Sequence, residues 1–202
     1  MARRSDHSPE ALRAMILAEG HQHLSEVGYS RFSAREVARR VGYAVGTLYH
    51  VFGTLDRLMF EINTITFRRW ADLLEQRLAE SEGRRLDALV EGYFDFATAN
   101  RHLWSAIWAH SMPEDEPLPE AAARDRARLT GLVVDEVASA LPKERRAGAD
   151  RLARSLIATV HGHCEYSLSG AFALMGVTDP VQLAKERVHS ELRSGGLQAE
   201  HG

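Results

Sequence analysis

Cysteine is almost missing from this chain of 202 residues, which contains one, Cys164. A single thiol excludes an intramolecular disulfide and is typical of proteins in a reducing compartment. The sequence also has no secretory signal, no low-complexity tract and no apolar run near the roughly 18 residues that a membrane-spanning helix needs. We therefore expect a cytoplasmic protein that does not enter a membrane.

Strand signals are scarce as well. Asn-Gly and Asp-Gly hairpin turns are absent, and apolar and polar residues do not alternate over any long stretch. Apolar residues instead recur at helical spacing along the chain. Because they make up 45% of the sequence, there are enough of them to bury a proper core. The fold class that we predict is all-α.

Periodicity and capping signals together predict about nine helices. The most obvious loop is 112–119, which contains three prolines and three acids. The helices are expected near residues 8–27, 33–41, 44–52, 55–81, 84–100, 101–111, 120–141, 143–175 and 179–194.

Charge is unevenly spread along the chain. The net charge of −3 argues against wholesale coating of nucleic acid, but residues 1–60 contain eight arginines against six acids. A slightly basic head on an acidic body suits a modest DNA footprint at one end. Arg3 and Arg4 form a basic arm, read either as a minor-groove contact or as a disordered tail.

The most informative stretch is 33–52, which predicts two short helices joined by a tight turn. Ser33 and Glu36 have the spacing of a capping box, so Ser33 is expected to cap the first helix while Glu36 reaches back to the Ser33 amide. Gly42 suits the left-handed conformation that ends a helix.

The second helix of this pair begins near Ala44 and places Leu48 and Phe52, four residues apart, on one face. Its other faces stay open. A compact pair of this kind mainly serves to hold its second helix in the major groove of DNA. The alternative is a helical hairpin buried in an ordinary bundle.

The order of residues here also carries a family resemblance. Residues 41–49, with the sequence VGYAVGTLY, and the following Phe52 resemble the helix-turn-helix signature of TetR-family transcriptional regulators, and the likeness runs from Ile16 to Leu58. It implies a three-helix DNA-binding domain at 1–53, followed by a helical ligand-binding and dimerisation bundle at 54–202.

The resemblance also implies a set of DNA contacts. Val45, Thr47 and His50 would face bases or the groove, the Tyr49 hydroxyl would bind a phosphate, and Gly46 would permit close backbone approach. The amides at the helix starts are further phosphate anchors, and Arg35 and Arg39 on the supporting helix could add contacts. The predicted DNA-binding residues are Ser33, Ala34, Arg35, Tyr43, Ala44, Val45, Gly46, Thr47, Tyr49 and His50.

Three positions depart from the family pattern. Ala44 replaces a common serine, so a cap worth about 1 kcal/mol is missing. Val51 and Leu55 stand where a phosphate-binding histidine and lysine are usual, and each lost contact should flatten the salt dependence by about one unit of slope. His50 and Arg57 are candidates to compensate. The alternative function is a fold relative with weakened DNA binding that acts through protein partners.

The body interleaves aromatic and polar side chains, as small-molecule sites do. We expect a small hydrophobic or aromatic effector to bind there, with His161 facing Trp108. The competing interpretation is plain core packing. The predicted ligand-binding residues are Tyr93, Phe94, Trp104, Trp108, His161 and Cys164.

The sequence gives little support for a metal site or for a catalytic nucleophile. His161 and His163 are two apart and diverge by about 200° on a helix, and a single pair of His161 with Cys164 is not a metal site. A Cys164 nucleophile has no orienting acid or glycine-rich oxyanion loop nearby. We predict no catalytic residue, no metal and no cofactor, so the chain is not expected to be an enzyme. A metal-responsive sensor is a lesser alternative.

Two apolar stripes near the end of the chain suggest a dimer. A helix-turn-helix reads a half-site, and a two-fold dimer reads two. The resemblance thus implies a homodimeric repressor that binds a palindromic double-stranded operator and is released by a small molecule. These stripes could instead be intrachain core. The predicted interface residues are Leu156, Val160, Leu168, Val181, Val188 and Leu192.

Overall fold

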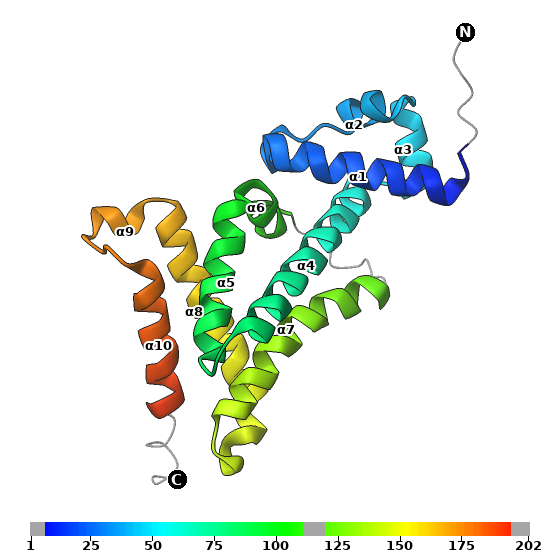
Figure 1. Cartoon of the computed structure of the whole chain (residues 1–202). Helices are drawn as coiled ribbons and strands as arrows, with labels where there is room; N and C mark the ends of the chain where they lie inside the picture. Colours follow the sequence, from blue (N-terminus) through cyan, green and yellow to red (C-terminus); the bar gives the residue numbers. More distant parts are fainter. Residues whose placement is uncertain (1–6, 111–119, 195–202) are drawn as a thin grey trace. The chain divides into compact units, whose positions relative to one another are not determined.

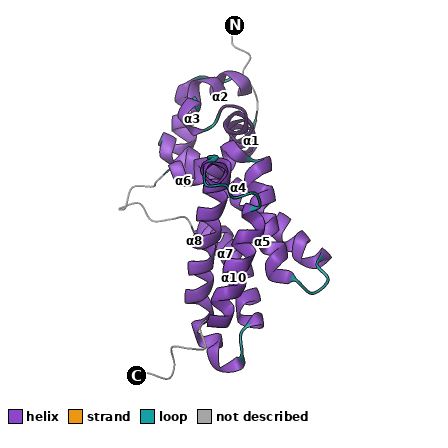
Figure 2. Ribbon diagram, turned by 90° about the vertical axis from the view of Figure 1, so that its left-hand side faces the viewer, coloured by secondary structure: helices purple, strands orange, loops and turns teal. Residues whose placement is uncertain are grey.

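The computed structural model describes residues 7–110 and 120–194, and these residues form helices and loops without a strand (Figure 2). Arg3, Arg4 and the predicted loop at 112–119 lie outside this part of the chain. The described part contains ten α-helices and two short 3-10 helices, which confirms the all-α prediction.

The chain divides into two compact units, one made of residues 1–68 and 100–125 and the other of 69–99 and 126–202. We call them unit 1 and unit 2. This division differs from the predicted domains at 1–53 and 54–202, because unit 1 also takes in the first half of the long helix α4 and all of α6.

Unit 1 has its core beneath the two short helices predicted from the sequence (Figure 1). Its buried cluster includes Ile16 and Leu24 of α1, Val37 of α2, Leu48 of α3 and Ile62 of α4. Its elements are α1 (Pro9–Val27), η1 (Tyr29–Arg31), α2 (Ala34–Val41), α3 (Val45–Phe52), the first part of α4 (Leu55–Glu80), α6 (Arg101–Ala109) and the start of α7 (Glu120–Ala140).

Unit 2 is a helical bundle in which α10 packs against both α5 and α8. Ala184 and Val188 of α10 are buried in it, as are Ala153 and Leu156 of α8. Its elements are the rest of α4, α5 (Arg85–Ala99), most of α7, η2 (Lys143–Gly148), α8 (Ala149–Leu168), α9 (Ala171–Leu174) and α10 (Pro180–Ser194).

Most helix boundaries fall within one or two residues of the sequence prediction, with one exception. The predicted helix at 143–175 is wrong, because the structure divides this range into η2, α8 and α9. Gly170 takes φ +81°, a left-handed conformation that ends α8 and that other residues rarely adopt. Gly162 stays within α8, so glycine alone did not mark the break.

Candidate functional site

The α2–turn–α3 pair forms as the sequence predicts. The Ser33 Oγ accepts a hydrogen bond from the Glu36 amide at 3.3 Å. Gly42 takes φ +78° at the end of α2, and the next amide, of Tyr43, donates to the Ala38 carbonyl at 2.9 Å. This arrangement satisfies the last carbonyls of α2 and turns the chain directly into α3.

The second half of the predicted capping box is wrong. The Glu36 carboxylate accepts hydrogen bonds from Arg39 at 2.7 Å and from Arg40 at 3.1 Å, and these arginines lower the pKa of Glu36 to about 2. The Ser33 amide donates instead to His23 Nε2 of α1, at 3.3 Å. Two arginines therefore hold Glu36 through charge-assisted hydrogen bonds. His23 of the preceding helix α1 accepts from the Ser33 amide in place of Glu36.

Helix α3 has one buried side and one open side. Leu48 and Phe52 are buried in unit 1, whereas Gly46, Tyr49 and His50 are exposed, and the Tyr49 side chain is 45% exposed. The first turn of α3 has no side-chain cap, since its N-cap residue is an alanine. Its free amides are thus available to a phosphate oxygen, which is how helix N-termini commonly bind DNA.

Other members of the predicted DNA-binding set differ in exposure. Ala34 is buried, so its side chain is not available to a ligand, and Tyr43 and Val45 pack partly against the core. Arg35 is exposed and forms no ion pair within the described residues, while Arg39 is already paired with Glu36. Arg35 is thus the readier phosphate contact of the two arginines.

One residue that the sequence interpretation missed anchors the far end of α3. Arg13 of α1 donates to the Val51 carbonyl at 3.4 Å and pairs with Glu61 of α4. Its guanidinium also lies 4.6 Å from the centroid of the Phe52 ring. Because these contacts join α1, α3 and α4, Arg13 helps to fix the direction of α3. No local pattern in the sequence marks it.

The departures at positions 51 and 55 have different structural meanings. Val51 is partly buried and packs against the core of unit 1, so its side chain supports α3. Leu55 is 40% exposed at the start of α4, directly after Thr54, whose hydroxyl caps that helix by accepting from the Arg57 amide at 3.1 Å. A charge introduced at position 55 would therefore reach solvent.

The His23–Ser33 hydrogen bond requires a His23 ring that is unprotonated at Nε2. His23 accepts at Nε2, so its proton is on Nδ1, which is buried without an acceptor among the described residues. Burial, and then the nearby Arg40, lower the pKa of His23 below its ordinary 6.5, against weaker opposing effects of Glu36 and Glu26. Protonation would set an N–H of the ring against the Ser33 amide.

We predict that unit 1 loses stability as the pH falls through 6.5 toward the lower pKa of folded His23. The unfolded chain, with its ordinary histidine pKa, binds more protons in this window, so acid favours it. Above this window the contribution of neutral His23 to stability is fully present. Urea unfolding at pH 7.5 and 5.5 measures the free energy of unfolding at each pH. This free energy should fall more in the native protein than in His23→Gln, whose side chain can still accept the hydrogen bond from the Ser33 amide. Equal falls in both proteins would contradict this.

In unit 2 the structure joins two of the predicted ligand-binding residues. The Tyr93 hydroxyl of α5 and His161 Nδ1 of α8 are 3.0 Å apart, and burial lowers the pKa of His161, which favours its neutral form. Trp70 of α4, which the sequence interpretation missed, meets the Tyr93 ring edge-on at 4.7 Å and stacks on Phe96 at 5.0 Å. Its indole Nε1 is buried and has no acceptor among the described residues.

The other predicted ligand-binding residues fall in both units. Trp104 and Trp108 belong to unit 1, where their rings meet edge-on at 6.3 Å and Trp108 is 48% exposed. Within unit 2, His161 has the hydrogen bond with Tyr93, and its expected contact with Trp108 stays a prediction. Phe94 is buried in unit 2.

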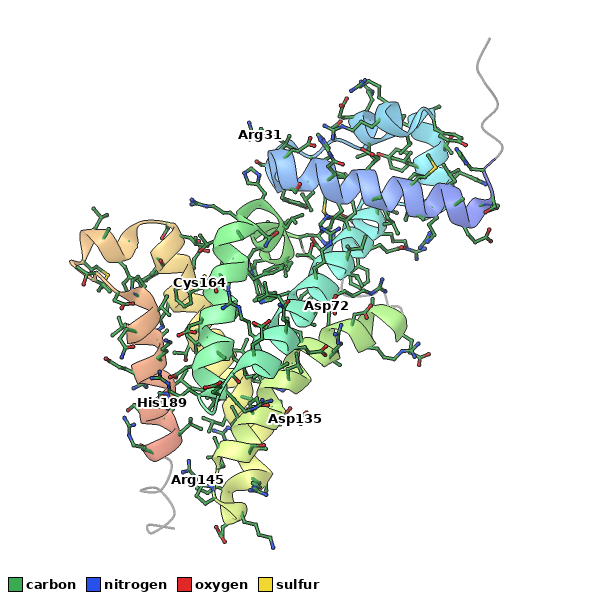
Figure 3. All side chains as sticks on the ribbon, viewed as in Figure 1. Arg31, Asp72, Asp135, Arg145, Cys164 and His189 are labelled. Carbon is green, nitrogen blue, oxygen red and sulfur yellow. The ribbon has the colours of Figure 1, made fainter. Side chains whose placement is uncertain are left out.

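Cys164 on α8 (Figure 3) is fully buried, and burial raises the pKa of its thiol to about 12. Since the thiolate is the reactive form, this cysteine is inert at neutral pH.

Across residues 7–110 and 120–194, no three side chains of His, Cys, Asp or Glu are grouped to hold a metal ion. No helix in that range is both long and apolar enough to cross a bilayer.

The predicted dimer residues need a correction. Leu156, Val160 and Val188 are buried within unit 2 of the single chain, so they are core and cannot present a surface to a second copy. The periodic stripe was read correctly as apolar, but α5, α8 and α10 of the same chain cover it. The remaining members, Leu168, Val181 and Leu192, are partly buried.

Comparisons with known proteins agree with this architecture. Residues 16–62 match the family described as bacterial regulatory proteins, tetR family, and residues 86–190 match the tetracyclin repressor-like C-terminal domain. The HTH-type transcriptional regulator BetI of Escherichia coli K12 is 30% identical over 131 residues, which is 60% of this chain and 66% of BetI, slightly less than two thirds of its length.

Solved structures show the same fold at low identity. A TetR-family transcriptional regulator from Streptomyces coelicolor aligns over 89% of this chain and 96% of its own, with a TM-score of 0.59 and 21% identity. NalD of Pseudomonas aeruginosa aligns over 93% of this chain and 99% of its own, with a TM-score of 0.56 and 16% identity. The two family matches show that the chain belongs to the TetR family of transcriptional regulators.

Proposed function

We propose that this protein is a repressor that binds a palindromic operator as a homodimer and leaves it when a small molecule binds unit 2. The observation that carries the proposal is helix α3, which presents Gly46, Tyr49 and His50 to solvent while Leu48 and Phe52 fix its other side. Such a helix can enter a major groove without disturbing the core that supports it. NalD, a relative in fold, is named as a secondary repressor of a multidrug efflux pump.

The test is binding of the purified protein to the intergenic DNA beside its own gene, with salt varied. Saturable binding to a short palindrome in the nanomolar to micromolar range, with a steep salt dependence, would support the repressor. Weak binding that ignores sequence would overturn it and favour a fold relative that acts through protein partners. The same assay can then screen small molecules for release of the DNA.

Leu55→Lys should steepen the salt dependence of this binding. Leu55 is exposed at the start of α4, so a lysine there adds one cation beside the DNA-binding helices. One further phosphate contact makes the slope of log K against log salt more negative by about 0.9. Thr98→Lys, which adds the same charge on the exposed side of α5 in unit 2, serves as the control. An unchanged slope in the Leu55 variant would place this residue away from the DNA.

For the dimer we propose an exposed face of unit 2 in place of the buried stripe. The large hydrophobic side chains exposed in the described part of unit 2 all fall within residues 166–183: Tyr166 at 51%, Leu174 at 92%, Met175 at 65% and Leu183 at 37%. This segment continues the exposed side of α8, where small residues permit a second helix to approach closely.

Light scattering of Leu174→Glu/Met175→Glu tests this face. The double variant should shift the native dimer toward monomer, whereas Thr98→Glu, on the exposed side of α5, should leave it intact. If both variants remain dimeric, residues 166–183 are not the interface.

The effector is proposed to bind beside the Tyr93–His161 pair, which offers polar groups among the aromatic rings of Trp70 and Phe96. Aromatic walls with a few fixed polar groups are usual in small-molecule sites. A compound that releases the native protein from DNA should act more weakly on Tyr93→Phe, which keeps the ring and loses the hydroxyl. An undiminished response would remove Tyr93 from the site.

A further inference from the structure

Unit 2 has a cavity of about 480 Å³ away from the Tyr93–His161 pair. It lies where the first turn of α5 meets the last turns of α7 and α10. His189, which lines it, is labelled on α10 in Figure 3. Leu86, Ala140 and Leu192, one from each helix, supply apolar lining. The volume is within the range of about 300–1,000 Å³ that small-molecule sites occupy.

Both carboxylates in the cavity wall already have a hydrogen-bonded partner. Glu136 accepts two hydrogen bonds from Arg85, from Nε and from a terminal nitrogen, each at 2.7 Å. Asp87 accepts from His189 Nε2 at 2.6 Å. The side chains of Glu136 and Asp87 are only 13% and 14% exposed. These pairs hold α5 to α7 and α10, and the charge of Arg85 offsets that of Glu136.

Two further arginines line the cavity and are not neutralised in this way. The side chain of Arg84 is 89% exposed, and its nearest acid is Asp87 at 4.0 Å, which is a weak pair at such exposure. Arg193 is exposed and has no ion pair in the part of the chain that the structure describes. The cavity therefore combines apolar lining from three helices with cationic side chains that a ligand can still engage.

We propose that this cavity binds a small organic anion, a carboxylate or sulfonate on an apolar body. Its acid group lies between Arg84 and Arg193, and its body packs on Leu86 and Leu192. Arginine recognises carboxylates with paired hydrogen bonds, which gives the acid a defined place. A bound ligand contacts α5, α7 and α10 at once, so it stabilises unit 2. This second site is independent of the proposed operator binding and of the Tyr93–His161 pair.

The probe is 4-isopropylbenzoate, compared with two molecules of the same shape, neutral 4-isopropylbenzamide and cationic 4-isopropylbenzylamine. Binding is followed by proton NMR at the ring signal of His189, identified by its loss in His189→Gln. The benzoate should shift this signal saturably and bind about tenfold or more tightly than the amide, a difference of about 1.4 kcal/mol. The amine should bind least.

Variants of the two arginines complete the test. Arg84→Gln/Arg193→Gln should weaken benzoate binding by about tenfold or more, because both partners of the acid are lost. Arg69→Gln/Arg151→Gln removes two exposed arginines of unit 2 that do not line the cavity and should bind as the native protein does. The proposal is overturned if amide and benzoate bind equally, if the first variant binds normally, or if the His189 signal does not move.

Discussion

Leu48→Ala is expected to lower the free energy of unfolding of the protein by about 2–5 kcal/mol and to abolish operator binding. Leu48 is 2% exposed, in the apolar cluster that α3 shares with α1, α2 and α4. Its truncation leaves a void that this small unit cannot fill without moving α3. If α3 changes its orientation, its exposed residues no longer reach the bases, even in molecules that remain folded.

The neighbouring residue gives the matched control. Tyr49 is 45% exposed on the same helix, so Tyr49→Ala should change stability by about 0.5 kcal/mol or less. It should nevertheless weaken DNA binding several-fold if its hydroxyl binds a phosphate, at a cost of about 1 kcal/mol. Urea unfolding and fluorescence anisotropy with labelled operator measure the two effects. If Leu48→Ala keeps native affinity, α3 is not held by its buried face.

The helix-turn-helix was predictable because its signals are local. Ser33, Gly42 and the spacing of Leu48 and Phe52 each act within a few residues of the chain, and the structure places all four as expected. The family resemblance then implied DNA contacts for residues whose chemistry alone does not indicate a role. In this part of the chain, local preference and tertiary packing favour the same structure.

What the sequence could not show is which of several possible partners a side chain takes. Glu36 has the right spacing to complete a capping box, yet Arg39 and Arg40 hold it, and His23, ten residues before Ser33, binds the free amide. Arg13 reaches residues 51 and 61. A carboxylate is held more strongly by charged arginines than by a neutral backbone amide, and the packing of α1 against α2 decides which partners meet.

The apolar stripes of α8 and α10 show a second limit. Periodicity identifies the apolar face of a helix, but it does not say whether the same chain or a second copy covers that face. Leu156 and Val188 are covered from within, whereas Leu174 and Met175, which lie outside any long stripe, remain exposed. The proposed dimer face can be identified only from the exposed fractions of its side chains in the structure.

Trp70→Ala is the second large expected effect, a loss of about 3–5 kcal/mol in the free energy of unfolding. Trp70 is 2% exposed and fills the space between Tyr93 and Phe96, with its ring stacked on Phe96 at an interplanar angle of 3°. Its removal leaves the largest kind of void that a single substitution makes and frees the Tyr93 ring. Trp108→Ala, which truncates a tryptophan 48% exposed, should cost far less.

Trp70→Phe separates packing from polarity at this position. Because the buried Nε1 of Trp70 has no acceptor among the described residues, phenylalanine removes no hydrogen bond and relieves an unpaired donor. It should therefore cost clearly less than Trp70→Ala, with only lost volume opposing it. Urea unfolding followed by far-UV circular dichroism compares the variants without relying on tryptophan emission. If phenylalanine costs as much as alanine, the indole N–H has a partner that stabilises the fold.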